Sequence, residues 1–131
     1  MSQEDRELAL EAYTAATARP KPDFETVNRL FDPEHVFVPL TAQIDTREFR
    51  GAAALSEFPD LRDWEGSIEA AVDVGRGKVL LVTQGEYRAS SSGPSVPFRS
   101  WIVATLRSGR VIRTELYVDP AKALEAAGPA E

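Results

Sequence analysis

The chain of 131 residues has no cysteine, a single histidine and no long apolar run. The absence of cysteine excludes disulfides, thiolate nucleophiles, iron–sulfur clusters and cysteine-based zinc sites. One histidine, His35, is too few for a histidine-rich metal site. No apolar stretch approaches the roughly 18–20 residues that a membrane span needs. We therefore expect neither a metal site nor membrane insertion.

Basic residues are also in the minority, with 15 Lys and Arg against 21 Asp and Glu, for a formal charge of −6. Such a chain has no bulk attraction to nucleic acid or to anionic membranes, so neither is an expected partner. The polar, acidic start of the sequence is unlike a signal peptide, which predicts a cytoplasmic protein. Its length and its hydrophobic fraction of 43% are those of a single globular domain, expected over residues 1–131.

Helical spacing dominates the first half of the sequence. This spacing predicts a helix over residues 2–18, and two prolines just beyond it mark its end. Asp23 is placed to cap a second short helix, and a third is predicted over residues 51–58. Between them, residues 35–39 have the β-branched and aromatic character of a short strand.

Alternating polar and apolar residues dominate the second half, which predicts an antiparallel meander of four strands after residue 66. Asp119-Pro120 then predicts the start of a terminal helix that Gly128 ends. The expected fold class is α+β, with helices on one face of a curved antiparallel sheet. Three N-terminal helices would close this sheet into a cone with a cavity, a common form of small-molecule site.

The last hairpin has a turn at Ser108-Gly109, which predicts the faces of its strands. Strict alternation places Arg99, Trp101, Thr114 and Leu116 on the cavity face. An inward guanidinium needs either an acidic partner, for which Glu86 is a candidate, or an anionic ligand group. The opposite face gathers apolar residues where polar ones are expected, which predicts a homodimer through the sheet, around Ile102, Ala104, Val111 and Tyr117.

Several short segments, in order along nearly the whole chain, resemble the SnoaL-like branch of the NTF2-like superfamily. This superfamily includes polyketide cyclases, ketosteroid isomerase and limonene epoxide hydrolase. The segments that carry the resemblance are Arg29-Leu30-Phe31-Asp32-Pro33-Glu34-His35-Val36, Phe49-Arg50-Gly51, Trp64-Glu65, Val72-Asp73-Val74-Gly75, Ser92-Gly93-Pro94-Ser95-Val96-Pro97, Thr105-Leu106-Arg107-Ser108-Gly109-Arg110-Val111-Ile112 and Tyr117-Val118-Asp119. The resemblance implies the NTF2-like cone, but the fold hosts unrelated activities.

The resemblance also implies roles for single residues. Tyr13 falls where the isomerases have a tyrosine that donates to a substrate oxyanion. The positions of the family's catalytic acids fall on Pro39, Trp101 and at or next to Leu116, and none of these can do acid–base chemistry. His35 and Asp45 are the remaining candidates for a base. The candidate ligand-binding residues, each of which also fits a core or surface role, are Tyr13, Phe37, Trp64, Arg99 and Trp101.

Two functions follow from these residues. The domain could bind a small apolar molecule, of polyketide or steroid type, and perform isomerase, cyclase or hydrolase chemistry without a cofactor. Alternatively, it could be a non-catalytic module for dimerisation or partner binding. Convergence of His35, Tyr13 and Arg99 on a deep pocket favours the first, and a cavity filled by tryptophans 64 and 101 and Phe37 favours the second. Whether the protein is an enzyme stays open at this point.

Overall fold

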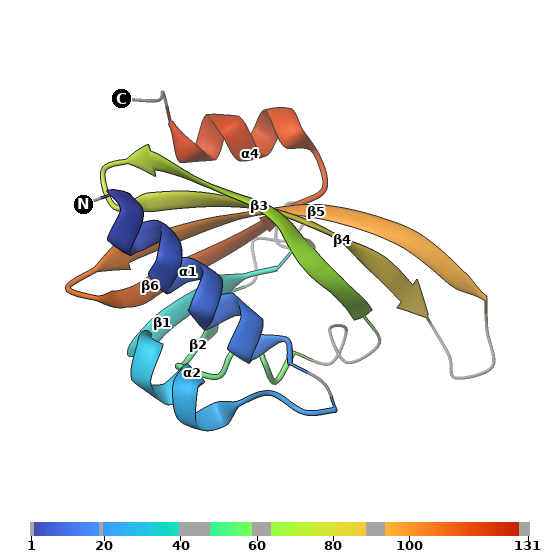
Figure 1. Cartoon of the computed structure of the whole chain (residues 1–131), viewed down its shortest axis with the longest axis horizontal. Helices are drawn as coiled ribbons and strands as arrows, with labels where there is room; N and C mark the ends of the chain where they lie inside the picture. The colour runs from blue at the N-terminus through green and yellow to red at the C-terminus, as the bar shows by residue number, and fades with distance from the viewer. Residues whose placement is uncertain (1, 19, 40–47, 59–63, 89–93, 129–131) are drawn as a thin grey trace.

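The computed structural model describes residues 2–18, 20–39, 48–58, 64–88 and 94–128. Six strands form one curved, open sheet (Figure 1), in the order β2-β1-β6-β5-β4-β3. The strand bounds are β1 Phe31–Val38, β2 Phe49–Arg50, β3 Trp64–Gly75, β4 Lys78–Arg88, β5 Ser95–Arg107 and β6 Arg110–Tyr117. The meander of β3 to β6 confirms the four antiparallel strands that alternation predicts.

Within the described ranges, three helices accompany the sheet, namely α1 Ser2–Ala16, α2 Phe24–Leu30 and α4 Pro120–Ala127. The cap positions expected from the sequence are confirmed. The Asp23 carboxylate accepts from the backbone N–H of Thr26 at the start of α2, and Asp119 does the same for Ala121 at the start of α4. Gly128, with φ of +84°, ends α4. None of the helices in the described ranges is long and apolar enough to cross a membrane.

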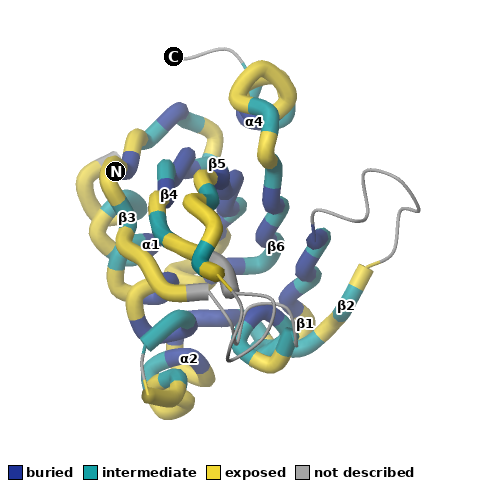
Figure 2. The backbone as a smooth tube through the Cα atoms, turned by 90° about the vertical axis from the view of Figure 1, so that its right-hand side faces the viewer, coloured by how far each residue is buried: buried dark blue, intermediate teal, exposed yellow. Residues whose placement is uncertain are grey.

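The two faces of the sheet bury separate hydrophobic clusters. Buried segments recur along strands such as β1 and β6 (Figure 2). We call the face toward α1 the inner face and the face toward α4 the outer face. The inner cluster joins α1 and α2 to the sheet through residues such as Tyr13, Leu81 and Ile102. The outer cluster is smaller and joins α4 to Leu80 and Val103.

Two glycines lie opposite each other where β3 and β4 pair, Gly66 and Gly85. A Cβ built on Gly85 would collide with the backbone of Glu65 and Gly66, so the close approach of these strands depends on the missing side chain. Phe98 pairs with Gly85 from β5. Paired glycines of this kind let a sheet bend sharply, which supports the curvature seen in Figure 1.

Three expectations about the architecture need correction. Residues 51–57 form successive turns instead of a third helix. The sheet is mixed instead of antiparallel, because β1 pairs with β6 in parallel. The helices do not share one face, because α4 packs against the outer face while α1 covers the inner one.

The expected register of the last hairpin is right at the turn and wrong beyond it. Leu106 pairs with Val111 as predicted, but Thr105 pairs with Arg113, which leaves Ile112 as an extra residue in β6. Such a β-bulge reverses the relation between the two strands' faces. Thr114 and Leu116 therefore face inward as expected. On β5, however, the inward residues are those that the unbulged register placed outside, including Ile102 and Ala104.

Candidate functional site

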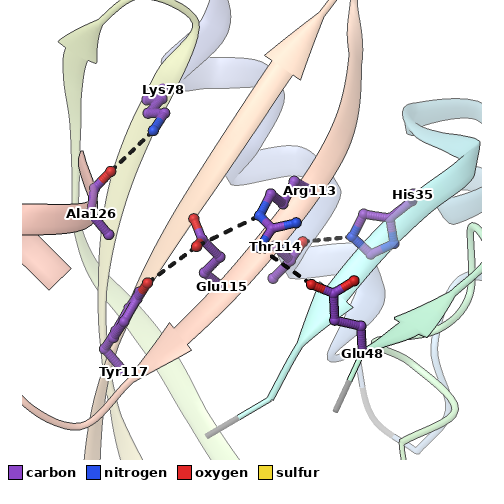
Figure 3. Close-up of polar contacts among 8 residues, drawn as sticks. All are labelled: His35, Glu48, Lys78, Arg113, Thr114, Glu115, Tyr117 and Ala126. Atoms are coloured by element: carbon purple, nitrogen blue, oxygen red, sulfur yellow. Dashed lines mark hydrogen bonds and ion pairs between the residues drawn. The ribbon is translucent and has the colours of Figure 1, made fainter. Parts of the chain in front are cut away.

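Three buried polar side chains from three elements meet beneath α1. The hydroxyl of Tyr13 on α1 lies 2.5 Å from the Thr114 Oγ1 of β6. The same Oγ1 lies 2.7 Å from Nε2 of His35 on β1, a contact drawn in Figure 3. His35 and Thr114 are fully buried and Tyr13 is 1% exposed. Polar groups buried to this degree need hydrogen-bond partners inside the protein, because bulk water does not reach them.

The fourth member of this group is the backbone of Gly51. Nδ1 of His35 lies 3.0 Å from the Gly51 carbonyl oxygen, and the Gly51 N–H donates to the His35 carbonyl at 2.8 Å. Gly51 has a φ of +126°, which residues other than glycine adopt only under strain. The carbonyl of Gly51 thus holds the His35 ring through its Nδ1. We call Tyr13, Thr114, His35 and the Gly51 carbonyl the buried relay.

Burial decides the charge of the relay. Desolvation lowers the pKa of His35 below its usual 6.5, against opposing effects of the Gly51 carbonyl and Asp32. Desolvation also raises the pKa of the Tyr13 phenol, and the negative charge of the nearby Glu115 carboxylate raises it further. The ring of Phe31 packs edge-on against both Tyr13 and His35 and adds to their burial. At neutral pH the relay therefore holds a neutral imidazole and a protonated phenol.

A small cavity adjoins the relay on the inner face, with a volume of about 40 Å³. Apolar side chains dominate its lining and every polar side chain in it carries a neutral hydroxyl: Tyr13, Thr17, Leu55, Ile68, Thr83, Phe98, Ser100, Ile102 and Leu116. The Thr83 and Ser100 hydroxyls lie 2.6 Å apart and bond each other. Among the described residues, no charged group lines this cavity.

The structure brings together two of the residues singled out from the sequence, His35 and Tyr13. Phe37 is also fully buried on the inner side, where it packs against Phe49 and Phe58. It is a core residue next to the site and does not line the cavity. Asp45 lies outside the described residues, and so does the side chain of Trp64, whose backbone begins β3.

Arg99 and Trp101 do not face the cavity, which corrects the prediction from strict alternation. The bulge in the hairpin turns both to the outer face, where Trp101 packs against the cluster beneath α4. The Arg99 guanidinium donates to Glu69 at 2.8 Å, with 55% of its side chain exposed. Its acidic partner is therefore Glu69 and not Glu86, and it lies near the Trp101 ring, 5.8 Å from the ring centroid.

The surface expected for a homodimer is also misplaced, for the same reason. Ile102, Ala104 and Val111 belong to the inner cluster and are buried against α1 and α2. The outer face of β6 carries a ladder of polar contacts instead (Figure 3). Arg113 lies 3.7 Å from the carboxylate of Glu48 and 3.6 Å from that of Glu115, and the Tyr117 hydroxyl donates to Glu115. Burial raises the pKa of Tyr117 to about 12, so this phenol keeps its proton in the ladder.

Sequence reasoning missed the residue at the centre of the relay. Strict alternation places Thr114 on the inner face, but nothing local marks it as the partner of two other side chains. Its partners are far away in the sequence, His35 by 79 residues and Tyr13 by 101 residues. The Phe49-Arg50-Gly51 segment was the available signal for the fourth member, since it places a glycine where the chain crosses beside β1.

The fold is shared with many solved structures. The protein called TerC, co-crystallised with polyporic acid, is 17% identical, with a TM-score of 0.70 over 91% of this chain and 94% of that one. A protein assigned as a SnoaL-like polyketide cyclase, from Jannaschia sp. CCS1, is 14% identical, with a TM-score of 0.68 over 98% and 94%. An NTF2-like protein of unknown function from Burkholderia pseudomallei is also 14% identical, with a TM-score of 0.68 over 95% and 98%.

These likenesses identify the class of structure: the chain has the NTF2-like fold of the SnoaL-like polyketide cyclases. The sequence matches no protein-family model and no curated protein. At these identities the likeness concerns the fold, and a fold that hosts many reactions does not specify one.

Proposed function

We propose that the protein binds a small, neutral, largely apolar molecule between α1 and the inner face of the sheet. The observation that carries this proposal is the lining of the cavity, which combines apolar side chains with uncharged hydroxyls from Tyr13, Thr17, Thr83 and Ser100. Sites for small molecules have this composition, with a few placed polar groups in an apolar wall. A charged ligand would find no counter-ion among the described lining residues.

The neighbours in structure support the small-molecule part of this proposal. One of them was crystallised with polyporic acid, and another is assigned as a polyketide cyclase. Ligands of polyketide or steroid type are therefore reasonable members of a screen. The cavity of about 40 Å³ is smaller than any of them, so such a ligand must displace side chains as it enters.

Ligand screening tests the proposal directly. A library of neutral ring compounds, with charged analogues of each, is incubated with the protein, and binding is detected by native mass spectrometry or ligand-observed NMR. We expect neutral members to bind and charged analogues to be excluded. Binding of the charged analogues alone, or of no member of the library, would overturn the proposal.

A matched pair of substitutions locates the binding. Ile68 lines the cavity, and Ile112 is also partly buried but lines an open groove that Asp32, Arg107 and Arg113 share. Ile68→Phe fills the cavity and is expected to abolish binding, while Ile112→Phe makes the same chemical change outside it. Equal loss of binding in both variants would show that the ligand does not occupy the cavity.

Self-association stays a prediction, and it now needs a different surface. Of the residues expected at a dimer interface, Ile102, Ala104 and Val111 are buried under α1 and α2, and Tyr117 packs against the cluster beneath α4. Light scattering at tens of micromolar protein tests for a dimer. No observation on the described residues favours the partner-binding module over the ligand-binding domain.

A further inference from the structure

The hydrogen atoms of the buried relay can be placed by elimination. The Gly51 carbonyl can only accept, so Nδ1 of His35 carries the imidazole hydrogen and donates it. A neutral imidazole has one N–H, which leaves Nε2 as an acceptor. The Thr114 hydroxyl, 2.7 Å away, must then donate to Nε2.

The same accounting fixes the tyrosine. The Thr114 hydroxyl has one hydrogen, and it is committed to His35, so toward Tyr13 it can only accept. The Tyr13 phenol therefore donates to Thr114, and its only hydrogen points away from any ligand. What its oxygen retains is an acceptor lone pair, on a residue that lines the cavity.

We propose that the relay makes Tyr13 a hydrogen-bond acceptor, so that the cavity selects neutral ligands that bear a hydroxyl group, alcohols or phenols, over ketones and ethers of the same size. This inference rests on the proposed function, since it concerns the same cavity. It is opposite in sense to the oxyanion-donating tyrosine that the family resemblance implies. Thr114 and His35 act as positioning residues, because they set the direction of the phenol without touching the ligand.

The other hydroxyls of the cavity are also engaged within the protein, and Thr17 Oγ1 donates to the Tyr13 carbonyl at 2.8 Å. Thr83 Oγ1 lies 3.2 Å from the Ser100 carbonyl, to which it donates, and 2.6 Å from Ser100 Oγ. When Thr83 donates to that carbonyl, the hydrogen between the two hydroxyls comes from Ser100, and both hydrogens of the pair are then used within the protein. The two hydroxyl networks present acceptors on the same inner face.

Three small ligands with one carbon ring test this inference: cyclohexanol, cyclohexanone and methylcyclohexane. At neutral pH the wild-type protein is expected to bind cyclohexanol about 3- to 10-fold more tightly than cyclohexanone, the range for one neutral hydrogen bond. Methylcyclohexane has no hydrogen-bonding group, so its affinity measures the apolar contribution of the cavity alone. Dissociation constants are measured by ligand-observed NMR on the full chain.

Substitution of Thr114 gives a result that a merely structural role would not. In Thr114→Val the phenol loses its acceptor, so its hydrogen is free to turn to the ligand and the preference is expected to invert toward cyclohexanone. Thr114→Ser keeps the hydroxyl and is expected to keep the wild-type preference. If Thr114→Val does not fold, Tyr13→Phe serves instead, with the preference for cyclohexanol lost and methylcyclohexane binding retained.

The outcomes separate the two proposals. Equal binding of all three ligands, or a wild-type preference for cyclohexanone, overturns the direction of the relay and leaves the proposed function standing. A Thr114→Val protein that still prefers cyclohexanol overturns it too. Binding of none of the three overturns the small-ligand function and this inference together.

Discussion

Thr114 Oγ1 lies 2.7 Å from His35 Nε2, and this contact joins β1 to β6 inside a region that water does not reach. The two strands run in parallel here, with Phe37 beside Thr114 in the register. A polar link at this point means that the sheet and the candidate site share one hydrogen-bond network. Changes in the site should therefore be visible in the stability of the fold.

The first prediction concerns that link. Among the described residues, Thr114 is the side chain that contacts both His35 Nε2 and the Tyr13 hydroxyl, and Thr114→Val removes these contacts without changing the volume much. Leaving buried polar groups without partners costs about 1–3 kcal/mol each, so we expect a loss of roughly 2–5 kcal/mol in the free energy of unfolding, with Thr114→Ser losing much less. Urea denaturation monitored by tryptophan fluorescence measures both. A Val variant as stable as the Ser variant would contradict the relay.

The second prediction is the pH dependence of stability. The pKa of His35 is lower in the folded protein than its unfolded value of 6.5. Between these two values the unfolded chain binds the extra proton, so protonation favours unfolding. Stability should be full above about 6.5 and fall as the pH drops through the window below it.

The measurement is the urea midpoint between about pH 5 and pH 8, where histidine is the only ordinary side chain that titrates. The control is His35→Gln, which cannot take up the proton and should show a flatter profile in this range. The lowered pKa of Asp23 belongs to a separate window, since its usual value is 3.8. A wild-type profile as flat as that of the variant would exclude a lowered pKa for His35.

A third prediction concerns Gly51. At its φ of +126° an alanine is strained, so Gly51→Ala should cost about 1–3 kcal/mol in the free energy of unfolding. Open space surrounds the missing Cβ, so the cost comes from the backbone and not from a clash. The carbonyl that accepts from His35 should move with it, and the imidazole resonances in NMR spectra should shift.

Gly109 provides the control for that experiment. It also has a positive φ, of +77°, and open space around the missing Cβ, but it lies in the turn between β5 and β6. Gly109→Ala is expected to lose stability while the His35 resonances stay in place. If both variants shift the His35 imidazole resonances equally, the Gly51 backbone does not specifically position the ring.

The fourth prediction concerns Arg99. Its ion pair with Glu69 is on the surface, with the two side chains 55% and 37% exposed. Pairs of this kind contribute about 0–1 kcal/mol, so Arg99→Met should change stability by no more than that, and ligand binding in the cavity should be unaffected. A double-mutant cycle with Glu69→Gln measures the pair. A loss of several kcal/mol in the free energy of unfolding would indicate that Arg99 is buried. It would favour the regular β5–β6 register without the bulge.

The sequence predicts the order of the meander and both N-caps because these depend on neighbours in the chain. The alternation along β3 and the Asp119-Pro120 pair are local signals, and local physics decides them. The helix over residues 2–18 is likewise predicted to within two residues of α1, since prolines 20 and 22 lie just beyond it.

The candidate site was predicted only in part. Tyr13 and His35 could be named because few residue types can do such chemistry, but the bulge at Ile112 was invisible. Val111 and Ile112 are both apolar and β-branched, so the sequence gives no sign of which one is extra. That one residue decides whether Arg99 or Ser100 faces the cavity, and so whether the cavity is charged or neutral.

The open sheet leaves β3 at one edge, and this has a consequence for solubility. A free strand edge is a template for another chain and a starting point for aggregation. Here the Arg6 guanidinium of α1 donates to the Ala71 carbonyl in the middle of the strand, so one site of intermolecular pairing is already taken. Glu69 on the same strand is paired with Arg99, but Glu65 is exposed and its carboxylate repels a second copy that approaches in the opposite direction. Glu65→Gln should therefore weaken the repulsion and expose the protein to edge-to-edge aggregation.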